Sequence, residues 1–271
     1  MILSNAVFKR LFGVKPGTFK KMLSILQKNY DKNHKFGGRP PKLSVEDKLI
    51  ITLKYLREYR TMENIGYDYG VSKSTVCESI QWVENTFKKD SAFKLPGKKV
   101  LKKATGDIEY VVVDVTESPT QRPKKKQHLY YSGKKKQHTI KTQIVIDGQS
   151  KKILYVSEGY GSEHDFSLYK RTMGTILPDS LLLYADLGYL GIHKLHAKSE
   201  IPHKASKFHP LTDSEKDYNK HLSRKRIVIE HVNAQIKTFK CMAYPYRNRC
   251  RRHLLRMSII CTIINLDRGF L

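Results

Sequence analysis

Hydrophobic positions along the first hundred residues recur at the spacing of helices, and almost no segment there has the alternation of a strand. Residues 5–29 predict a short helical unit. Residues 44–59 predict a longer helix that starts after Ser44, with Asp47 three positions on in a capping-box pattern. The region 1–95 is therefore expected to be entirely helical.

Two short helices joined by a tight turn are predicted in residues 60–87 (RTMENIGYDYGVSKSTVCESIQWVENTF). The first ends at Tyr69, and the second begins near Lys73 after a Gly-Val-Ser turn. The second helix has one apolar stripe, formed by Val76, Ile80, Val83 and Phe87. This is a helix-turn-helix arrangement, whose second helix can enter the major groove of DNA. Lys73 and Ser74 are candidate base or phosphate contacts there, and an ordinary solvated helix face is the alternative for each.

Beyond residue 95 the pattern changes from helices to strands. Residues 91–99 (SAFKLPGKK) are expected to be a linker. Strands are predicted at 108–118, 138–147, 151–160 and 181–186, and helices from about 162, at 212–240 and at 254–266. The helix from Ser162 has Asp165 three positions on, again a capping-box pattern, and 254–266 is too short to span a bilayer. Strands followed by helix, strand and helix predict an α/β layered domain over 96–271.

Charge changes this picture, because the 51 Lys and Arg residues outnumber the 25 Asp and Glu and give a formal net charge of +26. Self-repulsion of that size favours a polyanionic partner. Nucleic acid is favoured over an anionic membrane, since no lipid-facing segment accompanies the charge; a merely basic protein is the alternative. The four cysteines form no CxxC pair, which is typical of reduced thiols in a cytoplasmic protein.

The motif KKKQH occurs twice, at 124–128 and 134–138, and predicts a hairpin with its turn at Ser132-Gly133. Lysines interleaved with tyrosines suit a surface that follows phosphates and stacks on bases. Lys134, Lys135 and Lys136 are therefore candidate DNA contacts. A charged, solvated sheet edge is the alternative.

Three acidic residues stand out by their positions. Asp114 lies inside the apolar run VVVDVT, where a carboxylate must be paired or hold a cation, because desolvating it alone is costly. Asp186 closes the apolar strand LLLYAD, at the end of a strand where α/β sheets place their sites. Glu230 shares one narrow face of the long predicted helix with Arg226 and Lys237, a stripe that could also be a solvated face.

Three carboxylates from two strands and a helix can hold two hard cations bridged by a DNA phosphate. One cation activates the attacking hydroxyl and the other stabilises the leaving oxygen of an in-line displacement. Arg226 and Lys237 can then neutralise and position phosphates.

The chain resembles the DDE transposases of bacterial insertion sequences, specifically the insertion sequence 5 group, over nearly its whole length. The motifs that carry the resemblance are VVDVTESPTQRPKK, YYSGKKKQHTIKTQ, GSEHDF, ADLGYLG, IPHK and SRKRIVIEHVNAQIKTFK. The arginine four before Glu230 and the lysine seven after it match the family's helix signature. Two positions depart from the family: Ser223 stands where related groups have tyrosine, and Val115 follows Asp114 in place of glycine.

The resemblance implies an RNase H-like mixed sheet flanked by helices over 96–271, preceded by the all-helical helix-turn-helix domain of 1–95. It implies Asp114, Asp186 and Glu230 as catalytic residues and ligands of two Mg²⁺ ions, for which Mn²⁺ can substitute. The expected partners are double-stranded DNA, at the element's terminal inverted repeats and at the target, and at least one further copy of the chain when it is bound to DNA ends.

The expected location is the cytoplasm, in association with the nucleoid and without a membrane. Two alternatives to an active transposase stay open. One is a decayed or repressor-like protein that kept only sequence-specific DNA binding. The other is a nuclease without strand transfer.

Overall fold

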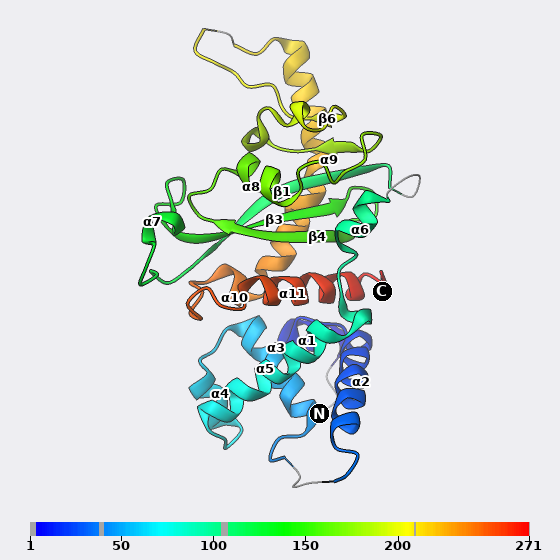
Figure 1. The fold of residues 1–271 in the computed structure, drawn as a ribbon, viewed down its shortest axis with the longest axis vertical. Coiled ribbons are helices and arrows are strands. Elements are labelled where there is room, and N and C mark those ends of the chain that lie inside the picture. Colours follow the sequence, from blue (N-terminus) through cyan, green and yellow to red (C-terminus); the bar gives the residue numbers. More distant parts are fainter. Residues whose placement is uncertain (1–3, 38–40, 104–107, 209, 271) are drawn as a thin grey trace. The chain divides into compact units, whose positions relative to one another are not determined.

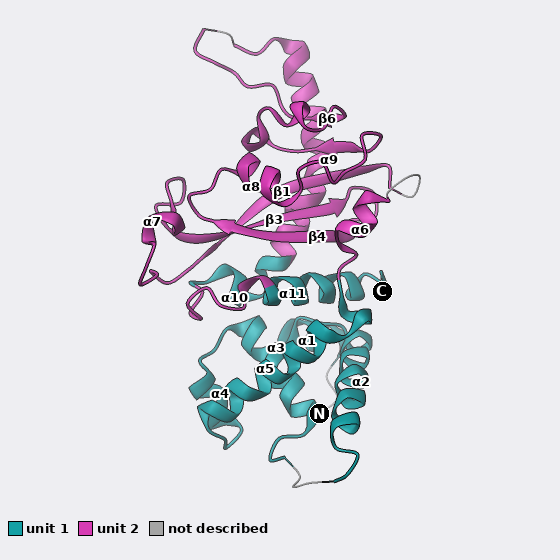
Figure 2. Cartoon of the chain, viewed as in Figure 1, with its two compact units in different colours: residues 1–94, 236–245, 255–271 teal, residues 95–235, 246–254 magenta. Residues whose placement is uncertain are grey.

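The structure is a computed structural model that describes residues 4–37, 41–103, 108–208 and 210–270. The chain forms two compact units, and each unit is built from segments that are not contiguous in the sequence (Figure 2). Unit 1 combines residues 1–94, 236–245 and 255–271, and unit 2 combines residues 95–235 and 246–254. The compact units therefore differ from a linear division at residue 95, because two C-terminal segments pack with the N-terminal helices.

Unit 1 is helical, as the apolar spacing predicts. Its helices are α1 (Asn5–Phe12), α2 (Pro16–Asn33), α3 (Val45–Glu58), α4 (Met62–Asp68), α5 (Lys73–Lys89), α10 (Lys240–Ala243) and most of α11 (His253–Asp267), with a short 3₁₀ turn at η1 (Ser91–Phe93). The predicted capping box of α3 is present. Asp47 N donates to Ser44 Oγ, and Ser44 N donates back to the Asp47 carboxylate, both at 3.0 Å.

Helices α4 and α5 form the predicted helix-turn-helix. Ser72 Oγ caps α5 by accepting from Thr75 N at 3.1 Å. The turn packs closely against Gly66 of α4, where an added Cβ would lie 2.6 Å from the carbonyl oxygen of Val71. The stripe Val76, Ile80, Val83 and Phe87 is buried, whereas Lys73 and Ser74 at the start of α5 are exposed.

Polar contacts fasten the C-terminal helix α11 to the N-terminal helices within unit 1. Arg256 is buried and donates from Nε to Glu84 Oε1 at 2.6 Å and from Nη1 to Tyr55 Oη at 3.2 Å. At the other end of α11, Asp267 Oδ1 accepts from Lys15 N at 3.0 Å and from Thr18 Oγ1 at 2.6 Å. The carboxylate of Asp267 thus takes the place of an N-cap for α2, whose own N-cap residue makes no side-chain capping bond.

Unit 2 is a mixed sheet flanked by helices, which confirms the predicted fold class (Figure 1). Its elements are α6 (Gly97–Lys102), β1 (Tyr110–Pro119), α7 (Gln127–Tyr130), β2 (Tyr131–Ser132), β3 (Gln137–Asp147), β4 (Ile153–Tyr160), α8 (Asp165–Thr172), β5 (Leu182–Tyr184), η2 (Leu187–Tyr189), η3 (Ile192–Lys194), β6 (Ser199–Glu200) and α9 (Asp213–Lys237). Strand β3 pairs antiparallel with β1, β2 and β4, while β5 lies parallel to both β1 and β6.

The two faces of strand β1 have different neighbours. Val111 and Val113 are fully buried in one apolar cluster with Tyr169 and Met173, from α8 and the residue after it. Successive strand residues point to opposite faces, so Asp114 points away from that cluster. Asn233 of α9 bonds to Asp114, which places α9 on this second face, and Figure 1 shows α9 crossing the sheet there.

Residues 91–99 were predicted to be a linker, and the boundary between the two units lies within them, after Lys94. This linker has local structure, because η1 lies in it, α6 begins at Gly97, and Phe93 stacks on Phe87 with ring centroids 4.1 Å apart. One prediction about local structure was wrong. The second KKKQH copy does not flank a turn at Ser132-Gly133. Gly133 and the three lysines of this copy form the turn between β2 and β3, and Lys136 N donates to Ser132 O at 2.8 Å.

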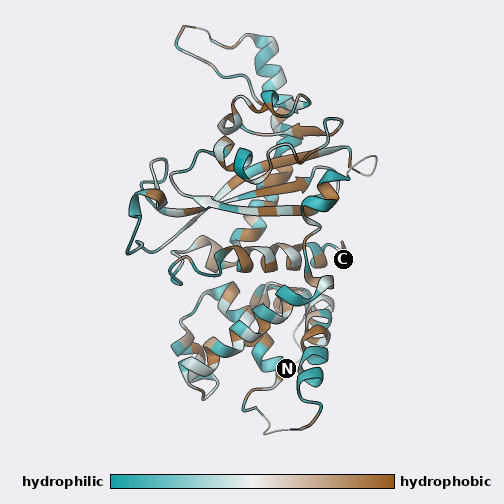
Figure 3. Ribbon diagram, in the orientation of Figure 1, coloured by the Kyte–Doolittle hydropathy of each residue, from teal (hydrophilic) through white to brown (hydrophobic). Residues whose placement is uncertain are grey.

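Apolar and polar residues are unevenly distributed over the elements. Apolar residues concentrate on the strands of unit 2 and on α11, whereas α7 and the chain around it are mostly polar (Figure 3). Within the described ranges, no helix is both long enough and apolar enough to cross a membrane. Cys241 and Cys261 are buried free thiols, and burial raises the pKa of Cys241 to about 12.

Candidate active site

Asp114 is the most enclosed acid of the three that the sequence singles out. Its Oδ2 accepts from Asn233 Nδ2 at 2.8 Å. Burial raises the pKa of Asp114 to about 7, and the negative charges of Asp186 and Glu230 add to this; the Val115 amide and the charge of Arg226 act in the opposite direction. All three predicted acids therefore lie close enough to influence one carboxyl group.

The strand register explains why Asp114 and Asp186 meet. Parallel strands β1 and β5 pair Val112 with Tyr184, and each aspartate lies two residues beyond its paired residue. The two carboxylates thus leave neighbouring strands at the same level. Asp186 then begins the turn η2, where its Oδ1 accepts from Gly188 N at 2.9 Å.

Helix α9 supplies the remaining polar groups. Glu230 is exposed, whereas Arg226 is half-buried and Asn233 is 9% exposed. Arg226 Nε and Asn233 Oδ1 find no hydrogen-bond partner among the residues that the structure describes. Lys237 belongs to unit 1, and its Nζ donates to the carbonyl oxygen of Met242 at 2.9 Å. Its predicted role at a phosphate stays a prediction.

The site's fit to a divalent cation rests on oxygen donors. A Cβ built on Gly188 would lie 2.8 Å from Asp165 Oδ2 and 2.9 Å from Asp186 Oδ1, so two carboxylate oxygens face one small space that only glycine leaves open. Asn233 Oδ1 adds a buried oxygen without a partner in the described chain. Oxygen-only donors suit Mg²⁺ or Mn²⁺. In the described residues, no three His, Cys, Asp or Glu side chains converge closely enough to bind one ion.

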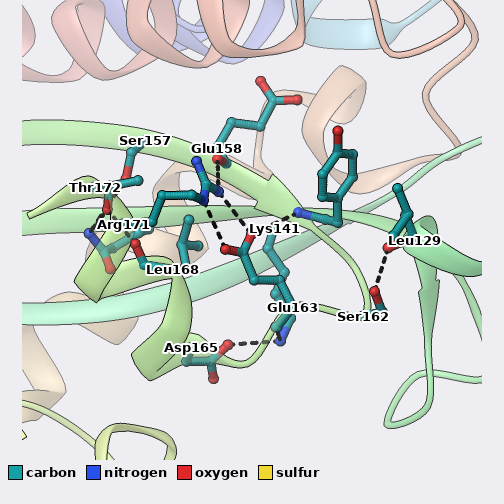
Figure 4. Close-up of polar contacts among 12 residues, drawn as sticks. Leu129, Lys141, Ser157, Glu158, Ser162, Glu163, Asp165, Leu168, Arg171 and Thr172 are labelled. Carbon is teal, nitrogen blue, oxygen red and sulfur yellow. Dashed lines mark hydrogen bonds and ion pairs between the residues drawn. The ribbon is translucent and has the colours of Figure 1, made fainter.

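The capping role predicted for Asp165 was wrong. Ser162 does not cap α8, because its Oγ donates to Leu129 O at 2.9 Å, and the N-cap residue His164 makes no side-chain capping bond. Asp165 Oδ1 instead accepts from Lys141 Nζ at 2.8 Å (Figure 4). The sequence signal for a role of Asp165 at the site is its place in the motif GSEHDF, although the capping-box spacing from Ser162 accounts for the same residue.

Two further titratable residues of unit 2, Glu117 and His196, have local partners. Glu117 accepts from Thr139 Oγ1 at 2.7 Å. His196 is buried and its Nε2 lies 2.6 Å from Leu181 O, so this ring is structural. The candidate DNA contacts Lys134, Lys135 and Lys136 are exposed in the turn between β2 and β3.

Glu158 of β4 is an acid that the sequence did not single out. It pairs with Thr142, which pairs with Thr116, so it lies on the same face of the sheet as Asp114. Burial raises the pKa of Glu158 to about 7, and a hydrogen bond from the Leu254 amide opposes this. His253 lies nearby, with its Nδ1 3.9 Å from Glu158 Oε1.

We expect Glu158→Gln to stabilise the protein above neutral pH. The folded protein holds a proton that the unfolded chain releases near pH 4.5, so the free energy of unfolding of the wild type falls as pH rises towards about 7. The variant should gain about 2 kcal/mol at pH 8 and almost nothing at pH 5. Urea unfolding at both pH values measures this. An equal change in the free energy of unfolding at both pH values would show that His253 keeps Glu158 charged.

Comparison with known proteins agrees with this geometry. The family described as DDE superfamily endonuclease matches residues 113–265, and the family described as helix-turn-helix of DDE superfamily endonuclease matches residues 41–92. The chain thus has the two parts of a DDE superfamily endonuclease, a helix-turn-helix and an α/β unit with acids on neighbouring strands.

Two relatives indicate which kind of DDE superfamily endonuclease the chain resembles. A probable transposase for insertion sequence element IS702 from Microchaete diplosiphon is 44% identical over 98% of this chain and 95% of that protein. A putative transposase for insertion sequence element IS112 from Streptomyces albus G is 26% identical over 85% and 83%. This chain belongs to the DDE transposase family.

The similarity of this chain to solved structures is weak. A Mos1 transposase paired-end complex with left transposon end has a TM-score of 0.23 and 10% identity, over 81% of this chain and 87% of that chain. At this TM-score the likeness supports no conclusion about the present chain. Membership of the insertion sequence 5 group is compatible with the relatives and stays a prediction.

Proposed function

We propose that this chain binds the ends of its own insertion element, cleaves DNA strands there and joins the freed ends to target DNA. The observation that carries the proposal is the parallel register of β1 and β5, which puts Asp114 and Asp186 side by side on a sheet with Glu230 close enough to affect the same carboxyl. Three acids brought together from distant segments are costly for stability, which is typical of a functional site.

In this proposal Asp114, Asp186 and Glu230 hold two Mg²⁺ ions. When bound, the ions supply activation of the attacking hydroxyl and stabilisation of the leaving oxygen. Asn233 holds the Asp114 carboxylate through its amide, 2.8 Å away. The Arg226 guanidinium, with a buried nitrogen that lacks a partner in the described chain, is suited to a non-bridging phosphate oxygen.

The test is incubation of the purified chain with DNA that carries its element ends, with and without Mg²⁺, together with a supercoiled target. The proposal expects cleavage at the ends and joined products only when the ion is present. Cleavage without joining would favour a nuclease. Binding of the ends without cleavage in Mg²⁺ or Mn²⁺ would favour a decayed or repressor-like protein.

DNA binding is expected to depend steeply on salt. Replacing Lys134, Lys135 and Lys136 together by alanine should weaken all DNA sequences alike and flatten the log–log salt slope by up to about 0.9 for each lost phosphate contact. Their exposure in the β2–β3 turn leaves them accessible. Fluorescence anisotropy between low and physiological salt measures the slope.

The matched control for that experiment is Lys73→Ala or Ser74→Ala at the exposed start of α5. If α5 reads bases, these variants should change which sequences bind and should alter the slope little. A triple-lysine variant with the wild-type slope would contradict the DNA contact and leave the turn as a solvated edge.

A further inference from the structure

Asp165, the first residue of α8, turns its two carboxylate oxygens to different partners. Oδ1 accepts from Lys141 Nζ at 2.8 Å, in a pair whose side chains are 24% and 12% exposed. Oδ2 faces the space over Gly188, 2.8 Å from where a Cβ would lie. Asp186 Oδ1 faces the same space from the other side, 2.9 Å from the same point.

Two buried polar atoms, on residues bonded to the candidate ligands Asp114 and Asp186, have no partner within the described parts of the chain and give independent support for a ligand. Asn233 is nine-tenths buried and bonded to Asp114, yet its Oδ1 has no partner within the described parts of the chain. The hydroxyl of Tyr189 is also buried without a partner there. Tyr189 directly follows Gly188, and its backbone N donates to Asp186 O at 3.1 Å.

We propose that Asp165 is a fourth carboxylate of the cation site, on the Asp186 side of Gly188, and that Lys141 is its counter-ion when no cation is bound. This rests on the proposed function, in which Asp186 is a cation ligand. The ligand class is a hard divalent cation such as Mg²⁺ or Mn²⁺, because every donor around the space is an oxygen. The Lys141 ammonium on Oδ1 then reduces the negative charge that the Asp165 carboxylate offers to a cation at Oδ2.

The same contacts also allow a purely structural role, and the two readings differ in what Lys141 does. Lys141 Nζ donates to Glu163 O at 2.7 Å, and Glu163 is paired with Arg171 at 2.9 Å (Figure 4). This network ties β3 to the start of α8. If Asp165 only anchored Lys141, removing either partner would lower stability and leave cation affinity unchanged.

The experiment measures Mn²⁺ affinity of the full-length chain by electron paramagnetic resonance, with thermal unfolding as the check on folding. Asp165→Asn should weaken Mn²⁺ binding roughly tenfold, the loss typical of an oriented group around a metal. Lys141→Met should leave Mn²⁺ binding unchanged or strengthen it, because it removes a positive charge next to the Asp165 carboxylate. Opposite responses of two paired residues are not expected of a tether.

Gly188→Ala provides a second variant in case Asp165→Asn folds poorly. Gly188 is exposed and its φ is not positive, so alanine is tolerated by the backbone, but its methyl group would fill the space between the two carboxylates. It should weaken Mn²⁺ binding, because the Asp165 and Asp186 carboxylates must move apart to admit the methyl group. Wild-type affinity in both Gly188→Ala and Asp165→Asn would overturn the inference, as would equal losses in Asp165→Asn and Lys141→Met.

Asp186→Asn separates this inference from the proposed function. Loss of Mn²⁺ binding in Asp186→Asn with wild-type binding in Asp165→Asn removes Asp165 from the site and leaves the proposed function standing. Wild-type binding in Asp186→Asn contradicts the proposed cation site itself, and the role of Asp165 fails with it. Weakened Mn²⁺ binding in Asp165→Asn and in Asp186→Asn, with no loss of Mn²⁺ binding in Lys141→Met, supports both this inference and the proposed cation site.

Discussion

Replacing Asp114 or Asp186 by asparagine, or Glu230 by glutamine, is expected to abolish strand cleavage and leave DNA binding nearly intact. Each change keeps the shape of the side chain and removes one anionic cation ligand. Cation stabilisation of a displacement is worth several kcal/mol. Losing about 4 kcal/mol corresponds to roughly a thousandfold in rate. Cleavage of end-carrying DNA in Mg²⁺, with binding followed by gel shift, measures both properties.

Asp179→Asn and Asp217→Asn are matched controls, because both acids are exposed in unit 2 and Asp217 shares helix α9 with Glu230. They change charge equally and should cleave at the wild-type rate. Asp114→Asn should also unfold at no lower temperature than the wild type, since burial already disfavours its charge. Wild-type cleavage in any of the three site variants would remove that residue from the site.

Removing residues 1–95 is expected to destroy cooperative folding of the remainder. The segment 255–271 packs in unit 1 with residues 1–94, so truncation strips α11 of its partners. Arg256 would lose both Glu84 and Tyr55. Burial of one large apolar side chain is worth about 1.5–3 kcal/mol, so exposing several of them on α11 removes a large part of the 5–15 kcal/mol that stabilises a typical domain. Urea unfolding and gel filtration of residues 96–271 measure the outcome.

Two controls show whether the lost partners are the cause. Co-expression of residues 1–95 with residues 96–271 should restore a soluble, cooperatively unfolding complex. In the full chain, Arg256→Met should lower the free energy of unfolding by about 3 kcal/mol, whereas Arg224→Met, at an exposed position, should change it little. A cooperative transition in the isolated 96–271 fragment would show that α11 folds without the N-terminal helices.

Local sequence patterns predicted most of the helices and strands correctly. Ser44 and Asp47 predicted a capping box that is present, because both partners lie within four residues and their bond needs no distant group. The same reasoning failed at Ser162 and Asp165. There Ser162 bonds to Leu129 O of α7 and Asp165 bonds to Lys141 of β3, and both partners lie more than twenty residues away in the sequence. Spacing alone cannot reveal such a competitor.

The site divides in the same way. The sequence by itself determined most of the strands and helices, that the net charge favours a polyanionic partner, and that Asp114 lies within one apolar strand while Asp186 follows another, since each of these depends on neighbouring residues or summed charge. Only the tertiary structure decided that Val112 pairs with Tyr184, that Asp165 faces Asp186 across Gly188, and that α11 belongs with the N-terminal helices. These depend on register and packing between segments far apart in the chain, which no local pattern specifies.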